Sequence, residues 1–103
     1  MKTWPEPFIA ILDGRKRFEI RRNDRGFMVG DLLILQEWDP ALAVEARSNH
    51  RAYPEKEAFT RRDITVVVTY VAPGGSWGLP ADMCVMGFDV GKTDLADALR
   101  SAE

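Results

Sequence analysis

Residues 14–21 read Gly-Arg-Lys-Arg-Phe-Glu-Ile-Arg, and this stretch decides how the rest of the chain is interpreted. Before it, apolar residues recur at helical spacing over residues 6–13. This pattern predicts a short helix that ends at Gly14, because a residue without a Cβ adopts the left-handed conformation most readily. Polar and apolar residues then alternate over residues 17–21, which is typical of a half-buried strand. We expect Phe18 and Ile20 to face the core, and Glu19 and Arg21 to lie side by side on the polar face.

The chain after this strand alternates between apolar runs and turn residues. Further strands are predicted from residue 32 to near residue 38, over residues 63–72 and over residues 83–90, because these stretches are rich in β-branched and other apolar side chains. No helical crossover is predicted between the strands. This order of predicted helices and strands therefore favours a mixed β-barrel with short helices, an α+β fold, over a parallel α/β sheet.

The length of 103 residues fits one compact domain. We expect the barrel to span residues 1–91, with a loop insertion at about residues 41–62, and a C-terminal helical tail to span residues 92–103. Residues 41–47 have the composition for two turns of helix, and the remainder of the insertion is predicted as loop. A loop of this length is either a lid over a binding site or a surface insertion.

The composition argues against several classes of protein. No apolar run approaches the ~20 residues of a membrane helix, and the N-terminus lacks the layout of a secretory signal, so we expect a cytoplasmic protein without a membrane partner. The single cysteine, Cys84, has apolar neighbours and is expected in the core. With His50 as the single histidine, the sequence offers no cluster with zinc-ligand spacing, and we expect no metal and no cofactor.

Charge is concentrated in one segment of the chain. Residues 15–25, which we call the basic strip, carry six basic and two acidic side chains, a net charge of +4, against −2 for the whole chain. A localised positive strip on an acidic protein indicates a site for an anion such as a phosphate. The alternative interpretation is a solvated strand whose cations form surface ion pairs.

The spacing Gly-x-Lys-x-x-Glu-x-Arg, formed by Gly14, Lys16, Glu19 and Arg21, resembles the signature of the ASCH domains, which are small relatives of the PUA fold. We call these four residues the motif. Further segments at residues 18–25, 29–31, 37–40, 68–71, 78–79 and 85–88 are similar to the domain of unknown function 3850 family, an ASCH-like group, and extend the resemblance over residues 2–89. The resemblance implies a PUA-like barrel and a cleft beside the motif that binds RNA or a nucleoside.

Three functional hypotheses follow from the residues and the resemblance. In the first, the protein binds RNA or a nucleotide. Glu19 orients an arginine or accepts a hydrogen bond from a base, and Trp38 or Trp77 either stacks on a base or packs in the core. The side chains that contact phosphate are Lys16, Arg17, Arg21, Arg22 and Arg25. In the second, it is an amidohydrolase acting on an N-acylated, cytidine-type nucleoside, an activity known among ASCH proteins, with Lys16 and Glu19 as catalytic residues. In the third, it is a small protein-interaction module that uses residues 41–62.

The sequence leaves open whether the protein is an enzyme. Arg15 and Arg17 crowd Lys16 and favour its neutral, nucleophilic form, whereas an ion pair with Glu19 favours the ammonium. In the amidohydrolases, the resemblance implies a hydroxyl residue at the position of Glu19 and an acidic residue from a later helix, and this chain has neither feature at the corresponding places.

Overall fold

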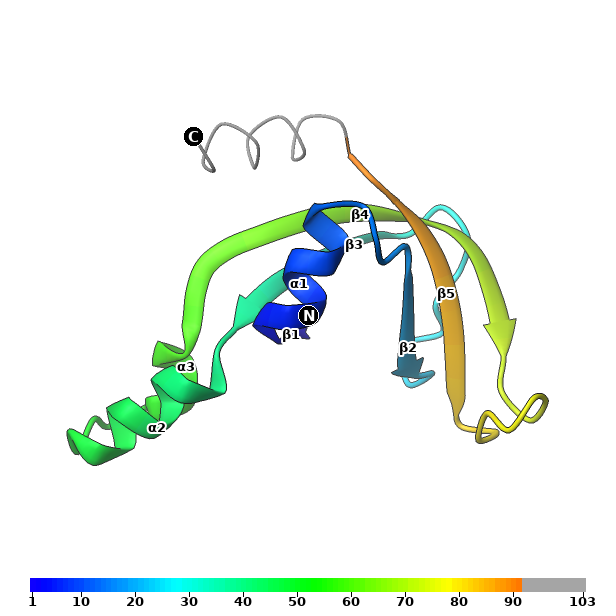
Figure 1. Cartoon of the computed structure of the whole chain (residues 1–103). Helices are drawn as coiled ribbons and strands as arrows, with labels where there is room; N and C mark the ends of the chain where they lie inside the picture. The colour runs from blue at the N-terminus through cyan, green and yellow to red at the C-terminus, as the bar shows by residue number, and fades with distance from the viewer. Residues whose placement is uncertain (92–103) are drawn as a thin grey trace.

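The computed structural model describes residues 1–91 of the chain, which form a single curled sheet with three short helices (Figure 1). The strand order is β1-β3-β4-β5-β2. The predicted C-terminal tail, residues 92–103, lies outside the described residues. The elements are β1 (Lys2–Thr3), α1 (Pro5–Leu12), β2 (Phe18–Arg22), β3 (Leu32–Trp38), α2 (Pro40–Ser48), α3 (Pro54–Glu57), β4 (Phe59–Pro73) and β5 (Met83–Val90).

The sheet is mixed and curls into a half-barrel. β1 runs parallel to β3, whereas the pairs β3–β4, β4–β5 and β5–β2 are antiparallel. β1 and β2 are therefore the two edges, and the chain between them crosses the inner side of the curve through α1 (Figure 1). This arrangement confirms the predicted mixed, barrel-like α+β fold.

Helix α1 is fixed by its ends and by its buried face. Pro5 occupies the first helical position, where its missing N–H costs no hydrogen bond. Phe8 and Ile11 are both 1% exposed, and burial of such side chains stabilises the fold by about 1.5–3 kcal/mol each. Gly14 has a φ of 85°, which confirms the predicted left-handed end of the helix. The backbone N–H of Lys16 then donates to the carbonyl of Ala10 at 2.9 Å, so the turn that follows the helix sets the start of the motif.

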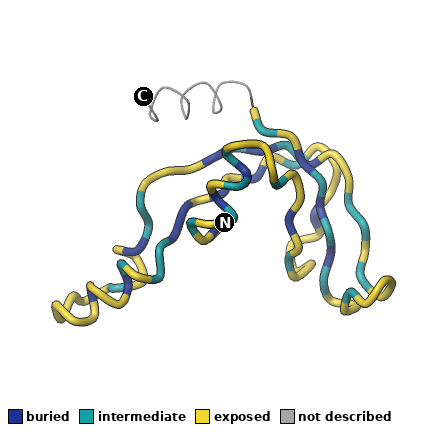
Figure 2. The backbone as a smooth tube through the Cα atoms, in the orientation of Figure 1, coloured by how far each residue is buried: buried dark blue, intermediate teal, exposed yellow. Residues whose placement is uncertain are grey.

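The main core fills the inner side of the half-barrel. Buried and more exposed residues alternate along β3, β4 and β5 (Figure 2), and the buried set of each strand faces the core. Cys84 is fully buried on β5, as predicted, and the burial raises the pKa of its thiol. The inward set, joined by Phe8, Ile11 and Phe27, consists of Leu33, Leu35, Ile64, Val66, Val68, Cys84, Met86 and Phe88.

The prediction for the faces of β2 is wrong. Phe18 and Ile20 are 46% and 48% exposed, whereas Glu19 is only 4% exposed. The register with β5 explains this inversion, because Glu19 pairs with the inward-facing Met86, and Ile20 pairs with Val85 on the outer face. Since side chains alternate with a period of two, pairing in this register places Glu19 and Arg21 on the inner side and leaves Arg22 on the outer face with Phe18 and Ile20.

The segment expected as a long insertion contains two helices. The predicted helix over residues 41–47 is confirmed within α2, and the stretch expected as loop contains α3 and the start of β4. Asp39 caps α2 by accepting a hydrogen bond from the backbone N–H of Ala41. A small second core of Trp38, Ala43 and Ala58 anchors the helices, which project away from the half-barrel (Figure 1). The lid and protein-interaction interpretations of this segment stay predictions.

Candidate functional site

Three side chains of the motif meet on the inner side of β2. The Nζ of Lys16 donates to Oε1 of Glu19 at 2.7 Å, and the Nε of Arg21 donates to Oε2 at 2.8 Å. The Glu19 side chain is 5% exposed, whereas those of Lys16 and Arg21 are 23% and 27% exposed. A buried carboxylate therefore holds two cations whose remaining donors reach solvent.

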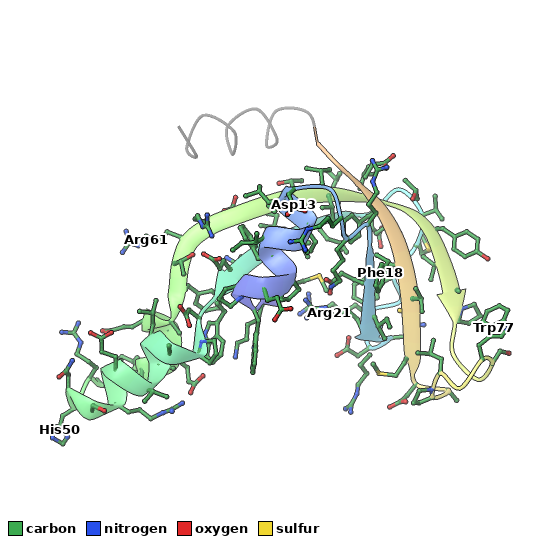
Figure 3. The ribbon with its side chains drawn as sticks, viewed as in Figure 1. Asp13, Phe18, Arg21, His50, Arg61 and Trp77 are labelled. Atoms are coloured by element: carbon green, nitrogen blue, oxygen red, sulfur yellow. The ribbon has the colours of Figure 1, made fainter. Side chains whose placement is uncertain are left out.

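Arg21 also joins the two edges of the sheet. Its Nη2 donates to the carbonyl of Lys2 at 2.9 Å and to the hydroxyl of Thr3 at 3.4 Å, both on β1. Figure 3 shows Arg21 pointing from β2 into the space beside α1. The guanidinium thus spans the open side of the half-barrel, where the two edge strands are not paired by their backbones.

A second buried carboxylate lies next to this network. Glu37 is 4% exposed and is the register partner of Thr3 across the β1–β3 pair. It accepts a hydrogen bond from the hydroxyl of Thr60 at 2.6 Å and a bidentate pair from Arg62 at 2.9 and 2.7 Å. The inner side therefore carries two polar clusters, one around Glu19 and one around Glu37, which adjoin where Thr3 pairs with Glu37; together we call them the inner network.

A bulge in β4 makes the contacts of Glu37 possible. The register with β3 shifts between Gln36 and Trp38, so that residues 60–62 lie opposite Glu37 alone. Arg61, in the centre of the bulge, has a φ of 72°. Because of this left-handed residue, the side chains of Thr60 and Arg62 both reach the carboxylate, and Arg61 points away from the site (Figure 3).

The two partners shift each other's pKa in the directions expected of an ion pair. The hydrogen bonds from Arg62 lower the pKa of the Glu37 carboxyl, against the opposing effect of burial, and Thr60 adds to the lowering. In return, the hydrogen bond from Glu37 raises the pKa of Arg62. The guanidinium also lies over the ring of Phe8, 5.2 Å from its centroid. Glu37 is thus held as a carboxylate against the first helix.

Sequence reasoning missed Glu37, Thr60 and Arg62 as members of the inner network. The signal was present in β3, where Leu33, Leu35 and Glu37 share the inward face. A charged residue in the phase of a buried apolar face requires a partner, because an unpaired buried charge is costly. The pairing of Glu37 with Arg62 depends on the bulge and was not readable from spacing.

The other predicted cations do not join Lys16 and Arg21. Arg17 approaches Asp89 and Arg22 approaches Asp82, each at 3.7 Å, and both arginine side chains are 72% exposed. Arg25 is exposed in the turn after β2 and forms no ion pair with residues 1–91. Part of the basic strip therefore consists of solvated surface pairs, as the alternative interpretation expected.

Arg25 is nevertheless close enough to act on the chain's first residue. Burial lowers the pKa of the Met1 amino group, and the charges of Arg21 and Arg25 lower it further. The same amino group donates to the carbonyl of Ile34 at 2.6 Å. Positive charge from three groups thus gathers near the β1 edge of the sheet.

The two candidate stacking tryptophans differ in their surroundings. Trp38 is 6% exposed, its Nε1 donates to the carbonyl of Glu55 at 2.8 Å, and the Nζ of Lys2 lies 4.0 Å from its ring centroid. These contacts favour the core interpretation of Trp38. Trp77 is 90% exposed at the tip of the β4–β5 turn (Figure 3).

Further features of residues 1–91 concern metal-binding groups, membrane-spanning helices and surface hollows. Within this part of the chain, no group of three or more His, Cys, Asp or Glu residues is placed to hold a metal ion. Over the same residues, no helix has the length and apolar character needed to cross a membrane. A shallow hollow lies between α2 and the residues around α3, away from the motif, and includes Arg51 and Glu57 in its lining.

The chain is similar to known proteins in two comparisons. Residues 1–88 match the family described as "Domain of unknown function (DUF3850)". A protein of Escherichia phage P2, described as "Uncharacterized 12.9 kDa protein in GpA 3' region", is 45% identical over 38 residues. That match covers 37% of this chain and 35% of the phage protein, so it spans about a third of either.

Proposed function

We propose a binding function for this chain, which belongs to the DUF3850 family: it is an ASCH-like, PUA-like module that binds RNA or a nucleotide at the inner network of the motif. The observation that carries the proposal is the convergence of Lys16 and Arg21 on the buried Glu19. A cytoplasmic location and the absence of a membrane partner remain part of this proposal.

The chemistry of the two cations supports an oxygen-rich ligand. An ammonium has three donors and a guanidinium has five, and the contacts to Glu19, Lys2 and Thr3 use only some of them. Because both cations are anchored to one carboxylate, their free donors are already oriented and lose little side-chain entropy on binding. Phosphate oxygens and base carbonyls are the acceptors such a donor pair suits.

The same geometry argues against Lys16 as a nucleophile. Nucleophilic attack requires a neutral amine, whereas the 2.7 Å contact with Glu19 is a hydrogen bond from an ammonium to a carboxylate. Glu19, with both oxygens already accepting, is poorly placed to exchange protons with a substrate. We therefore favour binding over the amidohydrolase hypothesis, which stays as the alternative.

A salt titration tests the proposal. We expect fluorescently labelled single-stranded RNA of about eight nucleotides to bind with an affinity that falls as salt rises, because phosphate contacts release counterions. The double variant Lys16→Gln/Arg21→Gln should weaken binding by at least tenfold and flatten the salt dependence. Arg51→Ala removes a cation paired with Glu57 at the distant α2–α3 segment and serves as the matched control.

The outcomes separate the hypotheses. RNA binding unchanged in the double variant, with its fold verified by circular dichroism, overturns the assignment of the site. Incubation with N-acylated cytidines tests the alternative, and turnover abolished by Lys16→Gln establishes an amidohydrolase instead.

A further inference from the structure

The outer face of the sheet carries an aromatic arrangement, which the motif meets at one point: the Nζ of Lys16 lies 5.4 Å from the ring centroid of Phe18. Gly87 on β5 is the register partner of Phe18 on β2 and of Tyr70 on β4. The two aromatic residues are 46% and 64% exposed. They therefore flank a glycine on the outer surface, opposite to the side on which Glu19 and Arg21 meet.

The spacing of the strands gives this arrangement the dimensions of a stacking site. Adjacent strands lie about 4.8 Å apart, so a flat ring placed over Gly87 has an aromatic residue on the strand to either side, close enough for contact between rings. The β4 register shifts between Val68 and Tyr70, so Thr69 is the extra residue of a bulge beside this position. Both Thr69 and Tyr70 are exposed, and each comes within 3.6 Å of the place where a Cβ on Gly87 would lie.

The neighbours of this site combine an apolar floor with a rim of two exposed arginine–aspartate pairs. The next row of the outer face pairs Ile20 with Val85, and Ile20 is 48% exposed. Arg17 and Arg22 bracket β2, and each contacts an aspartate at 3.7 Å with both partners exposed. Exposed ion pairs of this length are weak, so a phosphate can replace the aspartate as the partner of either arginine.

We propose that Phe18, Tyr70 and Gly87, here called the outer platform, stack an unpaired base of single-stranded RNA whose phosphates contact Arg17 and Arg22. Stacking on aromatic side chains of a sheet surface suits bases that are free of a duplex. The ligand class of this inference rests on the proposed function, but the surface lies on the other face of the sheet and is tested separately.

Single substitutions on the platform give the first test. Binding of an eight-nucleotide single-stranded RNA is measured for Phe18→Ala and Tyr70→Ala, and each is expected to lose about tenfold to hundredfold in affinity. Both side chains are exposed, so the melting temperature should stay close to that of the wild type. Tyr53→Ala is the matched control, because Tyr53 is 66% exposed on the distant α2–α3 segment.

Gly87→Ala gives an independent test of the glycine. The added methyl meets its neighbours at ordinary contact distance, so the fold should accept it, but the methyl occupies the floor on which the base lies. We expect weaker binding of RNA and no change for an oligomer of the same length whose nucleotides lack bases. Unchanged RNA affinity in this variant and in the two alanine variants overturns the platform.

The results distinguish this inference from the proposed function. If Lys16→Gln/Arg21→Gln weakens RNA binding and the platform variants do not, the motif site stands and the platform fails. If only the platform variants weaken binding, the platform stands and the motif site fails. If the platform variants instead abolish self-association in sedimentation experiments and leave RNA affinity intact, the outer face is an interface between copies and the inference is wrong.

Discussion

Replacement of Glu19 by glutamine tests whether one buried carboxylate holds the open side of the half-barrel together. Glu19 is 4% exposed and accepts hydrogen bonds from Lys16 at 2.7 Å and from Arg21 at 2.8 Å. A glutamine oxygen keeps one of these bonds, but its NH₂ group faces the other cation. One donor therefore loses its acceptor, and the contact of Arg21 with β1 loses its support.

The size of the effect follows from the burial of the three groups. A hydrogen bond to a charged group contributes about 1.5–3 kcal/mol. Because the side chains of Lys16 and Arg21 are 23% and 27% exposed, solvent screens them, and we expect the lower part of this range, about 2 kcal/mol. For a domain of this size, such a loss lowers the melting temperature by about 8–16 °C.

Thermal and urea unfolding at neutral pH, followed by circular dichroism, measure this loss. Asp82→Asn is the matched control, since Asp82 is 64% exposed and Arg22 approaches it only to 3.7 Å. The control should change the free energy of unfolding by less than about 0.5 kcal/mol, as exposed substitutions usually do. A Glu19→Gln protein as stable as the Asp82→Asn protein refutes the structural role assigned to Glu19.

Three other substitutions test separate parts of the fold. Arg62 lowers the pKa of Glu37 from its usual 4.5, so the ion pair stabilises the folded state above that pH, and this contribution is lost as the pH falls through the lowered pKa. In urea unfolding, Glu37→Gln should therefore have a lower free energy of unfolding than the wild type at pH 7, and the difference should shrink below pH 4.5. Arg61 has a left-handed φ of 72°, which is strained for a residue with a Cβ, and Arg61→Gly removes that Cβ. We therefore expect a higher melting temperature and a free energy of unfolding larger by up to about 1 kcal/mol, whereas a lower melting temperature contradicts the inferred strain. Gly74→Ala places a Cβ 1.9 Å from the carbonyl oxygen of Pro80 and should destabilise the β4–β5 turn by more than about 2 kcal/mol in chemical denaturation, whereas a stable Gly74→Ala protein excludes this close approach.

Much of the fold was readable from local patterns. Helix α1, its end at Gly14 and the strand over residues 83–90 agree with the sequence predictions, because periodicity and glycine conformation are properties of short segments. The side-by-side placement of Glu19 and Arg21 was also expected from strand alternation, whereas the sequence left open whether Lys16 pairs with Glu19. The predicted resemblance to the DUF3850 family is confirmed by the match over residues 1–88.

The inner network was only partly readable, for a physical reason that β2 illustrates. Alternation places Phe18 and Ile20 on one face and Glu19 and Arg21 on the other, but it does not say which face is inside. Hydrophobicity alone favours the apolar pair. The register with β5 and the contact of Arg21 with β1 decide otherwise, and both join residues far apart in the sequence.

The sequence by itself determined α1, α2, the four longer strands β2 to β5 and the charged motif, because these depend on side chains within a few residues of each other; β1 and α3 were not predicted. Only the tertiary structure decided that Glu19 and Glu37 are buried, that Arg21 ties β2 to β1, and that Phe18 and Tyr70 flank Gly87 on the outer face. Strand register and sheet curvature set these contacts. Both arise from the packing of the whole domain, and no local stretch of sequence encodes them alone.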